Sequence, residues 1–431
     1  MKIFNQEYRN RTIWIGVYYV LLLLLLFAWG NQNTSPPFIY KIAYCCLLFF
    51  PALFKHYDYV PMLFVGFSSI ALYGYAHSFM PTYLPIYVVG LIVFSVFCVP
   101  KRRTGYKLPG IVVFLGVYTL LVDLVTEAKI ENITYSIIII ILLGNFINKD
   151  INKTTISKYA AGLTLTTLVL SAYYILYRDS FTVEYYALDS GLERSGWMDP
   201  NYFGMVIGMG SVTAIMQLIR IKELGLLEKL FYLSTIILSL PTLVLNASRG
   251  AILAVGVSVS ILLLFSKLRT LYKVILIALI TGFICYLYNN SYFDLLEYRI
   301  LNDSGTGSGR TDIWQRKLSA FVENPIYWLT GYGNIGGKEL GMGQAYGSHN
   351  DYIAILCAYG LIGILTFVFM LAYPIIKLKK EATNKTIVIA LTVYMFVVCM
   401  TLEPYTAGRL PYFLYYLFVL LLLSASNARR L

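Results

Sequence analysis

Charged residues are scarce in this chain. They make up 13% of its 431 residues, whereas 58% of the residues are hydrophobic. A soluble domain has about 25% charged residues on average, because its surface faces water. The composition therefore excludes an ordinary soluble protein and indicates a polytopic membrane protein.

Residues that build metal sites and disulfides are also few. The chain has three histidines and six cysteines, and all six cysteines lie within or beside apolar runs. Cysteines in such places are typical of small buried hydrophobic residues, and their spacing matches neither a metal site nor a disulfide framework. We expect no metal and no cofactor.

Long apolar runs are abundant. A helix that crosses a bilayer needs about 20 mainly apolar residues. Such runs predict about fourteen transmembrane helices, at residues 12–30, 38–54, 60–77, 83–99, 108–127, 132–148, 159–177, 201–219, 230–247, 250–266, 271–288, 349–373, 386–402 and 411–425. We therefore predict an all-α polytopic membrane protein in which residues 1–431 form a single transmembrane domain.

Basic residues are concentrated on one set of alternate loops. If both termini lie on one side, that side carries 23 of the 34 lysines and arginines and a net charge of +17, and the other side has a net charge of −4. Cytoplasmic loops of membrane proteins carry an excess of basic residues. We predict that both termini are cytoplasmic. The overall charge of +12 then follows from the membrane topology, and we expect no nucleic-acid partner.

The segment 289–348 is predicted to be one long outer loop. Apolar residues recur in it at helical spacing after Thr311, at Ile313, Trp314, Leu318, Phe321 and Val322. This spacing predicts a short amphipathic helix, which we expect to lie on the membrane surface. Residues 178–200 are predicted to be a second polar connection on the outer side.

Three arginines lie on the predicted outer side, and Arg310 is at the start of the predicted surface helix. An arginine near the outer end of a span costs free energy unless it snorkels or is paired. Arg249 is either an interfacial anchor or a ligand for an anionic lipid headgroup. Arg194 either pairs with Glu193 or Asp199 or binds an anion. Arg310 follows a glycine-containing stretch whose backbone amides can approach an anion, or it is a solvated charge.

His349 is predicted to begin a transmembrane helix. Ser348 and Asp351 fit the cap and the third residue of that helix. The positive end of a helix lowers the proton affinity of a histidine and keeps it neutral, as a general base near pH 7 must be. The alternative is a histidine that only makes hydrogen bonds at the membrane interface and has no catalytic role.

Two further patterns are tempting but weak. Gly331-Tyr-Gly333-Asn-Ile-Gly336 matches the dinucleotide-binding fingerprint, but no strand precedes it, so we interpret it as a turn. Asp123 and Glu127 reach into a span at helical spacing. They could form a proton or cation site, and we favour a solvated helix end.

The order of the polar motifs resembles a known family. The motifs are Arg194-Ser-Gly with Asp199-Pro-Asn201, then Ser248-Arg249-Gly250, then Gly309-Arg310 with Trp314 and Asn324-Pro325, then Gly331-Tyr-Gly333, and last Ser348-His349-Asn350-Asp-Tyr352. In this order they resemble the O-antigen polymerase and O-antigen ligase superfamily of bacterial envelope membrane proteins. The resemblance covers residues 190–375.

The resemblance implies a reaction and a site. It implies metal-independent, inverting glycosyl transfer from a sugar chain on undecaprenyl pyrophosphate, at the extracytoplasmic face of the bacterial plasma membrane. Arg194, Arg249 and Arg310 would bind the pyrophosphate, and His349 and Arg310 would be catalytic. Partners would be the lipid-linked glycan, membrane lipid and a chain-length regulator protein.

Three functions stay open. We favour a polymerase that joins repeat units into O-antigen or capsular polysaccharide. The nearest alternative is an O-antigen ligase that transfers the finished glycan to a lipid A core. A flippase or transporter of lipid-linked sugars is the third, and it predicts mid-span charges or paired broken helices.

Overall fold

A computed structural model describes most of the second half of the chain and parts of the first. The described residues are 13–25, 46–54, 56, 59–71, 108–126, 153–177, 182–187, 193–195, 200–220, 225–266, 269–301, 310–333, 348–378, 384–405, 415, 419 and 422. Predicted spans 83–99 and 132–148 lie outside them, and so does Glu127.

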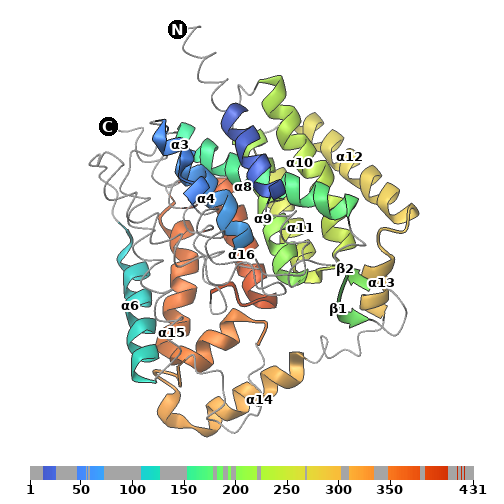
Figure 1. The fold of residues 1–431 in the computed structure, drawn as a ribbon. Coiled ribbons are helices and arrows are strands. Elements are labelled where there is room, and N and C mark those ends of the chain that lie inside the picture. Colours follow the sequence, from blue (N-terminus) through green and yellow to red (C-terminus); the bar gives the residue numbers. More distant parts are fainter. Residues whose placement is uncertain are drawn as a thin grey trace. The chain divides into compact units, whose positions relative to one another are not determined.

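The described residues are helical almost throughout (Figure 1). The helices are Ile13–Leu25, α3 (Phe50–Leu53), α4 (Val60–Ala71), α6 (Gly110–Val125), α8 (Lys153–Leu176), α9 (Pro200–Arg220), α10 (Leu226–Leu245), α11 (Arg249–Phe265), α12 (Thr270–Asn289), α13 (Asp294–Leu301), α14 (Arg310–Glu323), the 3₁₀ turn η3 (Pro325–Tyr327), α15 (Asp351–Ile376) and α16 (Lys385–Thr401). Helix α14 confirms the helix predicted after Thr311. Its place on a membrane surface stays a prediction.

Several helices have the length and composition of membrane spans. Four described helices are long and apolar enough to cross a bilayer, namely Ile156–Leu176, Asn201–Arg220, Leu226–Leu245 and Asp351–Ile376. Five shorter described helices of 10–17 residues are also apolar. The chain is therefore a multi-pass membrane protein, while the total of fourteen spans and the cytoplasmic termini stay predictions.

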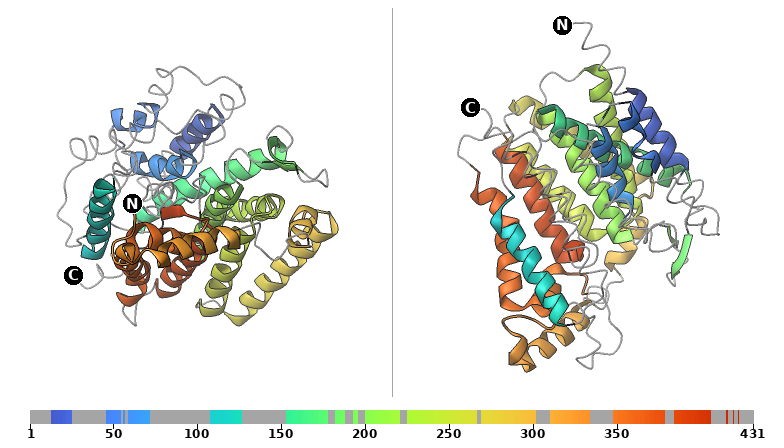
Figure 2. Two further views of the ribbon diagram at one scale, coloured as in Figure 1. Left: turned by 90° about the horizontal axis from the view of Figure 1, so that it is seen from below. Right: turned by 60° about the vertical axis from the view of Figure 1, so that its left-hand side comes forward.

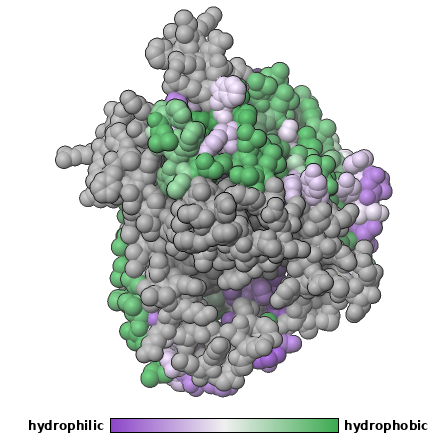
Figure 3. Space-filling model, in the orientation of Figure 1, coloured by the Kyte–Doolittle hydropathy of each residue, from purple (hydrophilic) through white to green (hydrophobic). Residues whose placement is uncertain are grey.

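The surface agrees with that class. Helix α12 exposes large apolar side chains along its length, among them Leu271, Val274, Ile277 and Leu279. Hydrophobic side chains also cover the face seen at the upper right of Figure 3. Contiguous exposed apolar surface of this kind is rare on soluble monomers and marks contact with lipid or protein.

Two strands depart from the all-α prediction. Strands β1 (Thr182–Ala187) and β2 (Glu193–Ser195) pair antiparallel with an irregular register, inside the segment 178–200 that is predicted to be a polar connection. Val183, Tyr185 and Tyr186 in β1 are the residue types that favour strands. The all-α class is therefore right for the described residues except for this short hairpin.

The chain divides into two compact units. Unit 1 comprises residues 1–99 and 153–248, and unit 2 comprises residues 100–152 and 249–431. In unit 1, α8 packs against α4, α9 and α10. Hydrogen bonds between polar side chains join its helices. Tyr19 and Thr166 share one of 2.9 Å, and Ser211 donates one to Ser239 at 2.7 Å.

Unit 2 holds most of the residues expected in the site. Helix α16 packs between α11 and α15, and α15 also packs against α6 and α14 (Figures 1 and 2). Arg249 is the first residue of α11, Arg310 is the first residue of α14, and a short loop precedes α15.

Candidate functional site

The end of α16 is the centre of a polar cluster in unit 2. Arg310 is the first residue of α14, and its Nη1 donates a hydrogen bond of 3.1 Å to the carbonyl oxygen of Thr401, the last residue of α16. The last four carbonyls of a helix have no partner within the helix, and this end of the helix dipole attracts cations. The Arg310 guanidinium is therefore held at a fixed point.

Arg249 begins α11 beside the same residue. The next residue, Gly250, lies so close to Thr401 that a Cβ atom at position 250 would overlap the threonine side chain. Only glycine lets the two helix ends approach this closely. Arg249 is therefore next in the chain to the residue that contacts Thr401, and Arg310 donates to the carbonyl oxygen of the same threonine.

The loop before α15 is fixed from two directions. The indole Nε1 of Trp314 in α14 donates to the Ser348 carbonyl oxygen at 2.6 Å, and the Ser348 hydroxyl contacts the carboxylate of Glu403. Ser348 is fully buried. These contacts tie the residue before His349 to α14 and to the chain that follows α16.

The start of α15 corrects one prediction. The N-cap is Asn350, whose Oδ1 accepts hydrogen bonds from the amides of Tyr352 (2.9 Å) and Ile353 (3.2 Å), and the helix begins at Asp351. Ser348 is therefore not the cap, and His349 precedes the helix. Asparagine is as good a cap as serine. The Ser348 hydroxyl contacts the Glu403 carboxylate and does not cap the helix.

His349 has a left-handed backbone. Its φ is 49°, which a residue with a Cβ adopts at a cost of about 1–2 kcal/mol. Ser348 and Asn350 on either side are held by the contacts given above, and this surrounding structure keeps the conformation in place. A non-glycine residue kept in this region is often found at functional sites.

The chain after α16 completes the cluster. The Asp351 amide donates to the Leu402 carbonyl at 3.0 Å, and the Tyr405 amide donates to Asp351 Oδ2 at 2.8 Å. Residues 402–405 are thus clamped to the start of α15. Thr401, Glu403 and Tyr405 are not among the predicted site residues. The available signal was Glu403, an acid directly after an apolar span.

Helix α15 is broken at Gly360. This glycine has φ 65°, and the backbone of Leu329 and Thr330 lies so close to it that a Cβ atom at position 360 would overlap it. The amides of Leu361 and Tyr332 donate to Trp328 O (2.8 Å) and Cys357 O (3.1 Å). The partners that the break removes from the helix are thereby replaced, as a membrane span requires. Gly331 and Gly333 both have positive φ in irregular chain, and the rest of the motif up to Gly336 lies outside the described residues.

Asp123 lies beside this break and corrects a second prediction. The residue is fully buried in α6, and the Tyr359 hydroxyl donates to its Oδ2 at 3.1 Å. The Tyr118 hydroxyl donates to the Tyr359 carbonyl oxygen at 2.9 Å. Asp123 is therefore not at a solvated helix end, because its carboxylate binds the residue that precedes Gly360.

The structure brings three of the four predicted site residues into unit 2. Arg249, Arg310 and His349 all belong to segments that contact Thr401–Glu403 or its direct neighbours. Arg194 lies in β2 of unit 1, and only its backbone is described. The pairing of Arg194 with Asp199 falls outside the described residues.

Comparison with known proteins gives one family match, which covers part of the chain. A family model described as O-antigen ligase matches residues 234–368, a range that includes Arg249, Arg310 and His349 and excludes Arg194. No curated protein gives a significant match to the chain. Residues 234–368 of this membrane protein are therefore an O-antigen ligase family domain.

Proposed function

We propose that the protein is a membrane glycosyltransferase that polymerises oligosaccharide repeat units carried on undecaprenyl pyrophosphate into O-antigen or capsular polysaccharide. The site would face the extracytoplasmic side of the bacterial plasma membrane. The family match supports processing of lipid-linked glycans, and the choice of polymerase is our inference.

One observation carries the proposal. The start of α11 at Arg249–Gly250, the Arg310 guanidinium and the loop that carries His349 all lie around the residues that end α16. Two arginines and one histidine on segments that meet at one helix end suit a diphosphate ligand and an attacking hydroxyl. Arg194 is a further ligand of the pyrophosphate in this proposal, on the strength of its motif alone.

The residue types fit the chemistry. A polyprenyl pyrophosphate is a good leaving group, so the enzyme must neutralise the charge that develops on it and remove a proton from the acceptor hydroxyl. Guanidinium groups form forked, charge-assisted hydrogen bonds with phosphate, each worth about 1.5–3 kcal/mol. His349 would take the proton as general base and would direct the hydroxyl at the anomeric carbon, with inversion and without a metal.

A ligase is the second candidate, because the matching family model is described as O-antigen ligase. It would use the same donor and the same arginines but transfer the finished glycan to a lipid A core. A transporter has less support. Within the described helices one span, α15, is broken, whereas the transporter alternative predicts a pair of broken helices.

Deletion of the gene in its own host separates polymerase from ligase. Loss of a polymerase leaves single repeat units on the carrier lipid, and loss of a ligase leaves long chains on it. Complementation with Arg249→Ala or His349→Ala should fail with either function, although the variants reach the membrane at normal levels. Long chains on their usual acceptor from either variant would contradict the proposal.

Purified protein gives the complementary test. Incubation with a synthetic polyprenyl-pyrophosphate oligosaccharide should give extended glycans, with and without a chelator. Extension in detergent, where there are no two compartments to separate, would also reject a transporter. No extension of any lipid-linked acceptor would count against the polymerase.

A further inference from the structure

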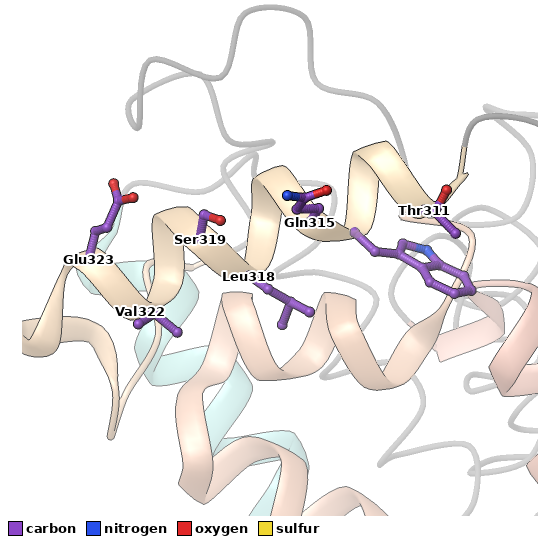
Figure 4. Close-up of a pocket in the computed structure, with 7 residues that line it drawn as sticks. Thr311, Gln315, Leu318, Ser319, Val322 and Glu323 are labelled. Carbon is purple, nitrogen blue, oxygen red and sulfur yellow. The ribbon is translucent and has the colours of Figure 1, made fainter. Parts of the chain in front are cut away.

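One side of α14 is seated against α15. The residues on that side are partly or fully buried and recur at helical spacing, namely Arg310, Ile313, Trp314, Lys317, Leu318 and Phe321. Phe321 packs in a buried cluster with Cys357 of α15. Thr311 and Ser319 are exposed, and Figure 4 shows them on the opposite side of the helix from Leu318. The seated side of α14 therefore has a fixed neighbour along its length.

Trp314 joins this side of α14 to the loop before α15. It lies four residues, or about one helical turn, after Arg310. Its indole Nε1 donates a hydrogen bond of 2.6 Å to the carbonyl oxygen of Ser348. Ser348 is fully buried, and a buried carbonyl oxygen needs a hydrogen-bond partner. The N–H group of Trp314 supplies one.

The contacts of α14 close a ring. Arg310 donates to the carbonyl oxygen of Thr401, and Trp314 donates to that of Ser348. The Ser348 hydroxyl in turn contacts Glu403, which lies two positions after Thr401. The start of α14, the chain that ends α16 and the loop before α15 are thus each bound to the other two. A shift of any one of these segments acts on the others.

The bond from Trp314 fixes the plane of the peptide that precedes His349. A peptide bond is planar, so the Ser348 carbonyl oxygen lies in one plane with the amide nitrogen and the Cα atom of His349. His349 is held at φ 49°, whereas residues with a Cβ prefer negative φ. Relaxation to negative φ turns this plane relative to the imidazole. The hydrogen bond to the carbonyl oxygen opposes that rotation.

We propose that Trp314 is a positioning residue for His349. Its indole holds the peptide plane in front of the histidine and so directs the imidazole at the acceptor hydroxyl. Arg310, one turn earlier on the same helix, binds the diphosphate, so α14 sets the base and the leaving group relative to each other. This inference rests on the proposed function, because it takes Arg310 and His349 in the roles given there. Trp314 acts through His349 and transfers no proton itself.

The test compares two tryptophans in full-length protein. Trp314→Phe removes the indole N–H and keeps an aromatic ring. The matched control is Trp328→Phe, because the Trp328 Nε1 donates to the backbone of the same helix, at Phe321 O (3.1 Å) and Val322 O (3.3 Å). If Trp314→Phe does not fold, 3-benzothienylalanine at position 314 replaces it, since this analogue keeps both rings and has sulfur in place of the N–H.

The first measurement needs no glycan transfer. Diethyl pyrocarbonate modifies neutral imidazole, and mass spectrometry gives the rate of modification at each histidine. The rate at His349 should rise about fivefold in Trp314→Phe, the change in equilibrium that the loss of one ordinary hydrogen bond permits. It should stay at the wild-type value in Trp328→Phe. His56, which belongs to unit 1, is the internal reference in every sample.

The second measurement is the rate of extension of a polyprenyl-pyrophosphate oligosaccharide. In Trp314→Phe, kcat should fall about fivefold or more while KM stays within about twofold, because the orientation of the base matters in the transition state. Trp328→Phe should keep both constants. A purely structural role for Trp314 instead predicts that the two variants lose Tm alike and that neither changes kcat per folded molecule.

Two failures are distinguishable. Trp314→Phe with a wild-type rate of His349 modification, or with kcat within about twofold of wild type, would overturn the positioning role and leave the proposed function standing. The same holds if both tryptophan variants expose His349 equally. Wild-type protein that extends no lipid-linked acceptor, although its His349 responds to Trp314→Phe as expected, would instead overturn the proposed function.

Discussion

The Arg310 guanidinium donates a hydrogen bond of 3.1 Å to the Thr401 carbonyl oxygen, although the two residues are 91 positions apart in the chain. The bond joins the first residue of α14 to the last residue of α16. Because Gly250 contacts the same threonine, one helix end aligns the segments that begin at Arg249 and at Arg310.

Gly250→Ala should destabilise the protein. Its new Cβ would overlap the Thr401 side chain, and overpacking of this kind costs about 1–3 kcal/mol. Thermal unfolding in detergent should show a lower Tm. Gly256→Ala on the same helix is the control, because a Cβ there meets open space and alanine favours the helix by about 1 kcal/mol. A second change, Thr401→Gly, should restore the stability lost in Gly250→Ala, and no recovery would argue against direct contact.

His349→Gly separates the backbone of this residue from its side chain. Glycine adopts the positive φ without strain, so the Tm should stay near that of wild type. Glycan transfer should be lost, because the imidazole is gone. His349→Asn should behave in the same way, since asparagine also tolerates this conformation. A glycine variant that still transfers glycan would remove His349 from the mechanism.

Glu403 should matter through its contact with Ser348. Glu403→Ala removes one of the two acceptors that the Ser348 hydroxyl contacts and leaves the Asn350 carbonyl oxygen at 2.9 Å, so it should slow glycan transfer by no more than about tenfold, the equivalent of one lost hydrogen bond. Glu403→Gln keeps an acceptor oxygen and should retain most of the rate. If glutamine and alanine lower the rate equally, the negative charge matters and the hydrogen bond does not.

Asp123 and Tyr359 should be energetically coupled. Asp123→Leu removes the acceptor of the buried Tyr359 hydroxyl, at a cost of about 1–3 kcal/mol in stability. Tyr359→Phe in the same background removes the stranded hydroxyl and should recover part of the loss. Unfolding of the two single variants and the double variant gives the coupling energy, and additive losses would mean that the hydrogen bond contributes nothing.

The sequence was sufficient for most of the long apolar helices that the structure describes, but not for α13 (Asp294–Leu301), which lies in the segment predicted to be a loop. Apolar runs predicted the positions of α9, α10, α11 and α16 to within a few residues, because bilayer thickness sets the length of such segments. Helical spacing of Trp314, Leu318 and Phe321 predicted α14. The β1–β2 hairpin was missed, because its strands are short and lie in a polar segment.

The sequence was not sufficient for the contacts. The break at Gly360 depends on backbone hydrogen bonds with residues 328–333. No local sequence pattern predicts these bonds. Ser348 fitted a cap by its residue type, but Glu403, 55 positions away, engages its hydroxyl. Asp123 was expected to be solvated, because only the fold brings Tyr359 to it.

The most direct measurement compares two arginines of one helix. The rate at which purified protein extends a polyprenyl-pyrophosphate oligosaccharide is measured for Arg310→Ala and Arg316→Ala. We expect that Arg310→Ala loses about a hundredfold or more in rate, as when one donor to a developing charge is removed, while Arg316→Ala keeps the wild-type rate. Equal rates for the two variants would contradict a pyrophosphate site at Arg310.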